Sequence, residues 1–383
     1  MSYKKFYQHF LRAHEGKLHM ACHSHHFWPD ITRQATLDYW DDSAKLSDHK
    51  WEYFFSQKIP ALQRHIAKRL NLSDPEQIVF APNTHDLLIR LLSLLDFKTK
   101  PKILTTDSEF HSFSRQITKL EEDSIVEVER LKTESETDLL NEIKLLSKSK
   151  SFDFIFISQT FFNSGRTITD LDQLVQLFDD HAIIVIDGYH SYMTKEISLK
   201  QIENRVYFIS GHYKYAQGGE GLCFMTCPPS EQNPKITGWF AQIDALASKQ
   251  GKIAFPAKAA RFWGSTMDFT PVYRSLAVYD LFDAEGLTTT KIHRHILDLQ
   301  NAFLDIISSL STKLLDQSML LNSAGDAQFL AFDLGSQEKA NNLEKKLRQH
   351  DILTDSRGST LRFGFSLYQE IKDFDKLRVI EQF

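Results

Sequence analysis

The chain has 383 residues, of which 42% are hydrophobic and 25% charged, the composition of a folded globular protein. Its net charge of −5 offers no basic surplus for nucleic acid, and no run of 18 apolar residues predicts a membrane span. Because it has only three cysteines and no secretory signal at its start, we expect a cytoplasmic protein.

The first segment with a chemical signature is rich in histidine. Residues 19–30 read H-M-A-C-H-S-H-H-F-W-P-D, and the cluster comprises His14, His19, His23, His25 and His26. No neighbouring carboxylate or cysteine completes a recognisable metal-ligand set. We therefore interpret the segment as a loop at the mouth of a pocket and predict no metal.

A strand followed at once by a helix comes next. Helical periodicity covers much of residues 31–70, then residues 78–80 form an apolar run and residues 86–95 an apolar helix. Asn83 and Thr84 between them are residues that favour helix N-termini. Backbone N–H groups at a helix start bind phosphate well, so this turn predicts a phosphate site.

Four further strands are expected at residues 102–105, 152–157, 181–186 and 206–209, with helices between most of them. These strands are continuous apolar runs, which is typical of a largely parallel sheet covered on both faces. Ligands of such sheets lie at the carboxyl ends of the strands. The side chains predicted to gather there are Asn83, Thr84, Phe110, Ser158, Asp187 and Lys214.

The pattern changes near residue 270. Two long helices, 271–285 and 288–310, precede short strands near 329–334 and 361–365, which indicates a smaller α+β domain. We expect an N-terminal segment (1–50) that contributes to the active site and the small domain, a large domain (51–265) and a small domain (266–383).

A lysine and an aspartate define the expected chemistry. Lys214 follows a buried strand, between aromatic residues and the glycine-rich turn A-Q-G-G-E-G. Desolvation lowers the pKa of a lysine and makes its amine nucleophilic, as a Schiff-base lysine requires. Asp187 ends the preceding strand. A pyridoxal 5'-phosphate site needs this pair, because the lysine binds the aldehyde and a carboxylate keeps the pyridine nitrogen protonated.

An amino-acid substrate also needs a partner for its carboxylate. The planar fork of arginine suits this task, and we assign it to Arg362 in L-R-F-G-F-S-L-Y. Arg166 and Arg261 are competitors. The histidine loop, through His25 and His26, is expected to set the side-chain preference.

These motifs together resemble the fold-type I pyridoxal phosphate enzymes of the class V aminotransferase group, and within it kynureninase. The resemblance rests on S-Q-T-F-F-N-S-G-R, I-D-G-Y-H, H-Y-K-Y-A-Q-G-G-E-G, T-G-W-F and F-W-G-S-T, and spans roughly residues 20–370. It implies a mostly parallel seven-stranded sheet in the large domain, and a homodimer with shared active sites.

The resemblance also implies a role for each matched residue. Lys214 holds the cofactor and Asp187 pairs with its pyridine nitrogen. Phe110 stacks on the ring and Ser158 supports it. The remaining roles are phosphate binding by Asn83 and Thr84, flanking of the cofactor by His190 and Tyr213, donation from the partner chain by Trp239 and Thr266, and binding of the substrate carboxylate by Arg362.

Several functions stay open at this point. The first is a kynureninase-like carbon–carbon hydrolase or lyase acting on an amino acid, and the alternative is an aminotransferase. A cysteine desulfurase is disfavoured because residues 310–362 contain no cysteine for a mobile nucleophile. A non-catalytic binding protein that uses the histidine cluster would have no need of the Asp187 and Lys214 pair.

Overall fold

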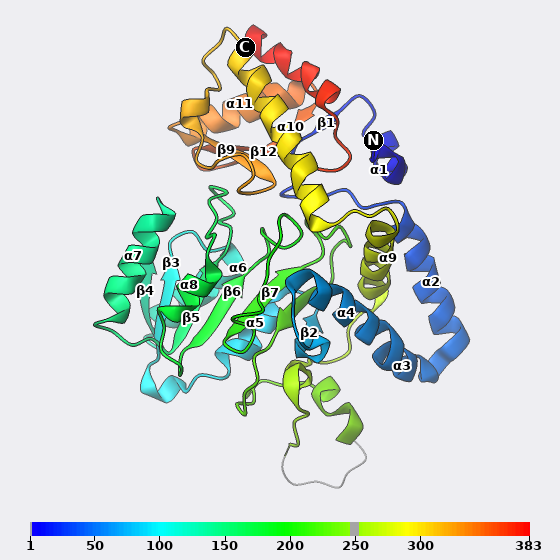
Figure 1. Cartoon of the computed structure of the whole chain (residues 1–383), viewed down its shortest axis with the longest axis vertical. Helices are drawn as coiled ribbons and strands as arrows, with labels where there is room; N and C mark the ends of the chain where they lie inside the picture. Colours follow the sequence, from blue (N-terminus) through cyan, green and yellow to red (C-terminus); the bar gives the residue numbers. More distant parts are fainter. Residues whose placement is uncertain (1, 246–252) are drawn as a thin grey trace.

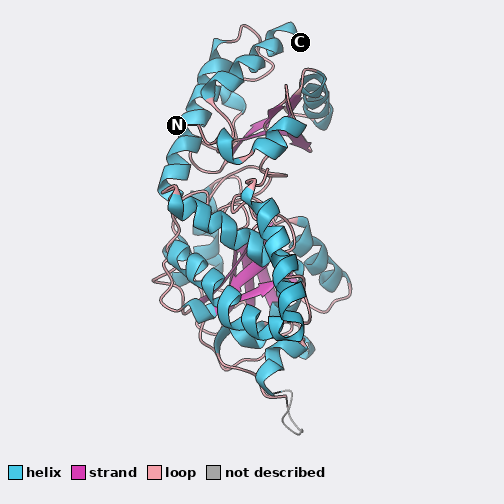
Figure 2. Cartoon of the chain, turned by 90° about the vertical axis from the view of Figure 1, so that its right-hand side faces the viewer, coloured by secondary structure: helices cyan, strands magenta, loops and turns pink. Residues whose placement is uncertain are grey.

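The computed structural model describes residues 2–245 and 253–383. The two main sheets lie one above the other in Figures 1 and 2, the smaller one at the top, and each packs against helices. Within these residue ranges, no helix is both long enough and apolar enough to cross a membrane.

The larger sheet has seven strands in the order β2-β8-β7-β6-β5-β3-β4. All neighbouring strands are parallel except where β8 meets β2 and β7. The predicted mostly parallel α/β fold is thereby confirmed. The strands are β2 (Ile78–Ala81), β3 (Lys102–Thr106), β4 (Glu127–Leu131), β5 (Phe154–Ser158), β6 (Ile183–Asp187), β7 (Val206–Gly211) and β8 (Cys223–Thr226).

Helices precede, connect and follow these strands, and α2 packs against α9 beside the large sheet (Figure 1). The α-helices of the described residues are α1 (Gln8–Ala13), α2 (Ile31–Leu46), α3 (Lys50–Tyr53), α4 (Ile59–Leu70), α5 (Thr84–Leu92), α6 (His111–Glu122), α7 (Glu136–Ser147), α8 (Leu171–Gln176), α9 (Thr270–Ala284), α10 (Thr289–Ser309) and α11 (Gln337–Gln349). The 3₁₀ or π segments of the described residues are η1 (Lys4–Phe6), η2 (Ser47–His49), η3 (Phe54–Lys58), η4 (Pro75–Gln77), η5 (Phe97–Thr99), η6 (Trp239–Ala245), η7 (Lys258–Phe262), η8 (Gln317–Met319) and η9 (Ile371–Gln382).

The smaller sheet is antiparallel and has the order β11-β12-β9. Its strands are β9 (Phe329–Asp333), β11 (Asp355–Arg357) and β12 (Thr360–Gly364). The N-terminal segment joins this end of the molecule, because β1 (Leu18–His19) pairs with β10 (Ile352–Leu353). Residues far apart in sequence therefore meet beside the small sheet.

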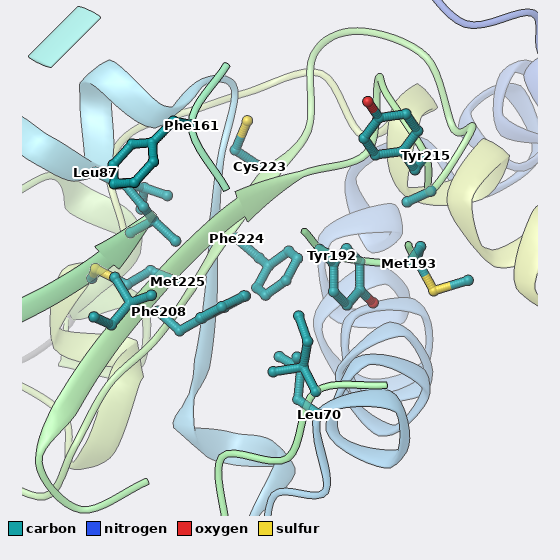
Figure 3. Close-up of a cluster of buried hydrophobic side chains, with 14 of the residues drawn as sticks. Leu70, Leu87, Phe161, Tyr192, Met193, Phe208, Tyr215, Cys223, Phe224 and Met225 are labelled. Atoms are coloured by element: carbon teal, nitrogen blue, oxygen red, sulfur yellow. The ribbon is translucent and has the colours of Figure 1, made fainter. Parts of the chain in front are cut away.

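The main hydrophobic core includes residues of both sheets, and part of it lies against the large sheet. Phe224 packs edge-on against Tyr192 with ring centroids 5.0 Å apart, and Phe208 lies beside it (Figure 3). A Cβ on Gly188 would come within 1.9 Å of the Phe208 ring. The Phe208 ring thus occupies the space of a side chain at residue 188, so glycine is favoured there and the backbone directly after Asp187 lies close to this ring.

Candidate active site

A cavity of about 360 Å³ lies where the parallel strands of the large sheet end. Its wall combines the strand ends of the large sheet with the β11–β12 hairpin of the small sheet. The predicted site residues that line it are Asn83, Thr84, Phe110, Ser158, Asp187, His190, Tyr213, Lys214 and Arg362.

Lys214 is buried in the cavity wall, three residues after β7. Its Nζ contacts Nε2 of His190 and lies 5.1 Å from the ring centroid of Tyr189 and 5.6 Å from that of Phe110. Burial, reinforced by the charge of Arg362, lowers the pKa of Lys214 to about 7. A large fraction of the amines is thus uncharged at neutral pH.

His190 is also buried, and burial together with Lys214 and Arg362 holds the pKa of His190 well below its usual range. The imidazole is therefore neutral at neutral pH. Its Nε2 can accept a hydrogen bond from the Lys214 amine, while Nδ1 faces the Tyr215 hydroxyl at 3.5 Å.

Asp187 is the last residue of β6 and lies opposite Ser158 of β5 and Ile209 of β7. Its Oδ1 accepts a hydrogen bond of 2.8 Å from the backbone N–H of Tyr189. Burial raises the pKa of Asp187 to about 6, although the Tyr189 N–H and the charge of Lys214 oppose the rise. Within the described ranges no side chain donates to this carboxylate. The second oxygen of Asp187 is therefore available to a hydrogen-bond donor on a bound ligand.

The turn after β2 forms an anion-binding geometry on the same cavity. The side chain of Asn83 accepts a 2.9 Å hydrogen bond from the backbone N–H of Asp86 and so caps α5. The first N–H groups of α5, at Thr84 and His85, have no partner within the helix. Both Asn83 and Thr84 line the cavity, so a phosphate could bind there.

Arg362 enters the cavity from β12 but is already engaged. Its Nε and Nη2 donate to Oδ1 and Oδ2 of Asp355 at 3.0 and 2.6 Å, and its Nη1 donates to the carbonyl of Phe162. Burial alone would raise the pKa of Asp355, but His23 and Arg362 hold it well below its usual range. The ion pair between Asp355 of β11 and Arg362 of β12 therefore belongs to the wall of the cavity. Arg166 and Arg261 donate to backbone carbonyls away from the cavity.

A comparison with known families gives this geometry a context. The family model described as aminotransferase class-V matches residues 31–377. The chain belongs to the class-V aminotransferase family. Enzymes of this family use pyridoxal phosphate, and the protein is a pyridoxal-phosphate-dependent enzyme of the aminotransferase or lyase type.

Solved structures agree with the family at the level of the fold. A mutant of C-DES with glycine covalently linked to the PLP cofactor has a TM-score of 0.80 and 15% identity, covering 98% of each chain. Apo cysteine desulfurase from Thermococcus onnurineus NA1 has a TM-score of 0.75 and 16% identity, covering 96% of this chain and 94% of that one. The comparison with curated proteins found no match.

The residues of this class-V family member fit the cofactor. Asp187 is a buried carboxylate with an oxygen available, which suits the N–H of a pyridinium ring. The start of α5 suits the phosphate, and Lys214 lines the same cavity. Phe110 supplies an exposed aromatic face beside the amine.

One buried carboxyl group beneath the site was missed from the sequence. Glu109 accepts hydrogen bonds from the Ser158 backbone N–H at 3.1 Å, from the Ser158 hydroxyl at 2.5 Å and from the Thr106 hydroxyl at 2.7 Å. Burial raises the pKa of Glu109 to about 8. The Ser158 hydroxyl thus donates to Glu109. The same hydrogen bonds fix the position of Glu109, which directly precedes Phe110. In the sequence, a glutamate in the polar run D-S-E looks like a surface residue.

The histidine loop requires a correction. His25 is exposed and lies 3.6 Å from Glu220, whereas His26 is buried edge-on against Tyr368 and bonds the Phe27 carbonyl at 2.6 Å. Neither residue lines the cavity, because the loop turns His26 into the core and His25 outward. His23 and Ser24 line it instead. In the described residues, no group of three histidine, cysteine or acidic side chains is arranged to hold a metal.

Three further predicted residues have contacts that the sequence did not indicate. The Tyr213 hydroxyl donates to the carbonyl of Ser24, which ties the lysine loop to the histidine loop. Nε1 of Trp239 donates to the Thr266 hydroxyl at 3.1 Å, and neither of these residues lines the cavity of their own chain.

Proposed function

We propose that this enzyme cleaves the bond between the β-carbon of an α-amino acid and its substituent, as a lyase or hydrolase. The observation that carries the proposal is the convergence of Lys214, Asp187 and the α5 start on one cavity. The similarity to kynureninase, which would make the broken bond a carbon–carbon bond, rests on sequence motifs alone.

The chain's own groups would act as follows. Bound pyridoxal phosphate supplies an electron sink for the bond broken at the α-carbon. Asp187, largely ionised at neutral pH, would hold the proton on the ring nitrogen. The uncharged Lys214 amine would accept the α-proton, and the neutral Nε2 of His190 would orient that amine through their contact.

A cysteine desulfurase receives little support from the cysteines, although solved desulfurases share the fold. That reaction needs an exposed, mobile thiolate. All three cysteines, Cys22, Cys223 and Cys227, are buried. Only Cys223 lines the cavity, and burial raises the pKa of its thiol to about 12. A lyase or hydrolase, which needs no protein thiolate, is better supported.

An aminotransferase is the second candidate, because the family match carries that name. Both reactions begin with proton removal by Lys214, so products must distinguish them. The holoenzyme should be incubated with a panel of amino acids that includes kynurenine and cystine, with and without pyruvate and 2-oxoglutarate. Product formation without any 2-oxo acid supports the lyase or hydrolase, whereas products that require a 2-oxo acid would overturn it in favour of the aminotransferase.

We also propose a homodimer in which Trp239 and Thr266 serve the site of the partner subunit. The sequence motifs T-G-W-F and F-W-G-S-T support this. Large exposed apolar side chains lie near one motif at Ile236 and Trp239, and on α2 at Trp40, as a buried subunit surface requires.

A further inference from the structure

The lysine loop, residues 213–221, connects β7 to β8. The ladder of these antiparallel strands ends where the backbone N–H of His212 donates to the carbonyl of Leu222 at 3.0 Å. Lys214 is the second residue beyond that point, so its backbone receives no support from the sheet. A loop outside a ladder keeps its shape through other contacts. The position of the Lys214 amine therefore depends on what holds the loop.

The loop folds back on itself and lies against α9. The backbone N–H of Gln217 donates to the carbonyl of Lys214 at 3.0 Å, and that of Gly218 donates to the carbonyl of His212 at 2.7 Å. A Cβ on Gly218 would come within 2.4 Å of Oγ of Ser275 on α9. The turn that carries the lysine is thus packed closely against this helix.

Arg274 of α9 holds the outer part of the loop. Its Nε donates to the carbonyl of Gly218 at 2.8 Å, and its Nη2 donates to the carbonyl of Glu220 at 2.5 Å. One planar guanidinium therefore bridges two carbonyls and fixes their relative positions. The Trp28 ring lies 5.1 Å from Cζ of Arg274, and a Cβ on Gly219 would come within 2.8 Å of the same ring. The N-terminal segment thus supports the bridge.

The electrostatic environment of the Lys214 amine comes from other elements. Burial is the largest cause of its lowered pKa, and the charged groups that modify this pKa are Asp187, Asp355, Arg357 and Arg362. The other titratable side chains that face the amine are His23, Tyr189, His190 and Tyr213. Arg274 is not among these groups. We therefore expect Arg274 to act on the amine through the closed loop, which maintains its burial.

We propose that Arg274 is a positioning residue for Lys214, and that its bridge between the carbonyls of Gly218 and Glu220 keeps the lysine loop closed and the amine buried. Loss of the bridge frees the loop and lets water reach the amine, so the pKa of Lys214 returns toward its ordinary value. The inference goes beyond the proposed function and rests on it only in taking Lys214 as the reactive amine.

Reductive methylation probes this amine without cofactor or substrate. Full-length apoprotein is treated with formaldehyde and cyanoborohydride over a range of pH, and the initial rate at Lys214 is measured by peptide mapping. Only an uncharged amine reacts, so the midpoint of the rate profile reports the pKa and should lie near pH 7 in the wild type. Arg274→Gln should move the midpoint upward by about one pH unit or more.

A second arginine provides a matched control. Arg205 also bridges two backbone carbonyls, those of Asp179 and Asp180, at 2.8 and 2.7 Å, and it does not line the cavity. Arg205→Gln should keep the wild-type midpoint even if it lowers the melting temperature as much as Arg274→Gln. Arg274→Lys keeps the positive charge but loses the planar fork, so it should raise the midpoint as well.

The outcomes separate positioning from stability and from charge. An unchanged midpoint in Arg274→Gln, or an equal rise in Arg205→Gln, overturns the inference. So does a wild-type midpoint in Arg274→Lys, because charge alone would then suffice; this variant also decides the test if Arg274→Gln does not fold. None of these results affects the proposed function. A wild-type midpoint near the ordinary lysine pKa of about 10.4 would overturn the inference and count against Lys214 as the reactive amine as well.

Discussion

Replacing Asp187 with asparagine tests the centre of the proposed site. Asparagine keeps the shape and the oxygen that accepts from the Tyr189 N–H, so the fold should persist. It loses the charge that would hold a proton on the pyridine nitrogen. A hydrogen bond to a charged group contributes about 1.5–3 kcal/mol, so cofactor affinity should fall about 10- to 150-fold. Turnover should fall by at least about 100-fold, the usual effect of removing one electrostatic contact in an active site.

A neighbouring carboxyl group provides the control. Glu109 is as buried as Asp187 but does not line the cavity, and with its pKa raised to about 8 it is mostly protonated at pH 7. Glu109→Gln therefore replaces one neutral group with another and should change cofactor affinity by less than about 3-fold. Both variants are titrated with pyridoxal phosphate by absorbance at pH 7. If Asp187→Asn binds and turns over like wild type, Asp187 is not the partner of the ring nitrogen.

Three further outcomes are expected. Borohydride reduction of the holoenzyme should fix the cofactor on Lys214, as peptide mapping will show; a label on another lysine contradicts the assignment. The rate of cofactor uptake by the apoprotein should rise up to about pH 7 and then level off, because the lowered pKa of Lys214 leaves the amine uncharged above that pH; an amine with the ordinary pKa near 10.4 would give a rate that climbs to about pH 10. Mixing Lys214→Ala with Trp239→Ala chains should restore part of the activity lost in each, since one site of a mixed dimer keeps both residues; a monomer in sedimentation would remove the basis for this.

The large sheet could be predicted because its strands are buried on both faces. F-D-F-I-F-I and H-A-I-I-V-I are continuous apolar runs, and the structure has β5 and β6 there. Lys214 and Asp187 follow from the same pattern, since residues after parallel strands meet at one edge. β4 was missed because E-V-E-R-L is an edge strand with charged, partly exposed positions. β8 was missed because its four residues follow a glycine-rich turn.

The small-sheet side of the site could not be predicted in the same way. The pairing of Asp355 with Arg362 depends on the register of a hairpin, which the spacing of seven residues does not determine. The sequence therefore predicted Arg362 as the partner of the substrate carboxylate, and it lines the cavity, but the sequence carried no sign of the ion pair with Asp355. His25 and His26 were likewise chosen from composition, whereas the path of the loop brings His23 to the cavity.

The N-terminal segment connects the two sheets at the active site. β1 pairs with β10, and the carbonyl of Met20 accepts a 2.6 Å hydrogen bond from the backbone N–H of Gly364, which fastens the segment to the small sheet. Four residues later, the carbonyl of Ser24 accepts a hydrogen bond from the hydroxyl of Tyr213, the residue before Lys214. Any displacement of the small sheet would therefore act on the lysine loop as well as on the arginines of the cavity wall. The histidine-rich segment thus links the small-sheet wall of the cavity to the lysine loop, a role that needs neither a metal nor a place for His25 or His26 in the cavity wall.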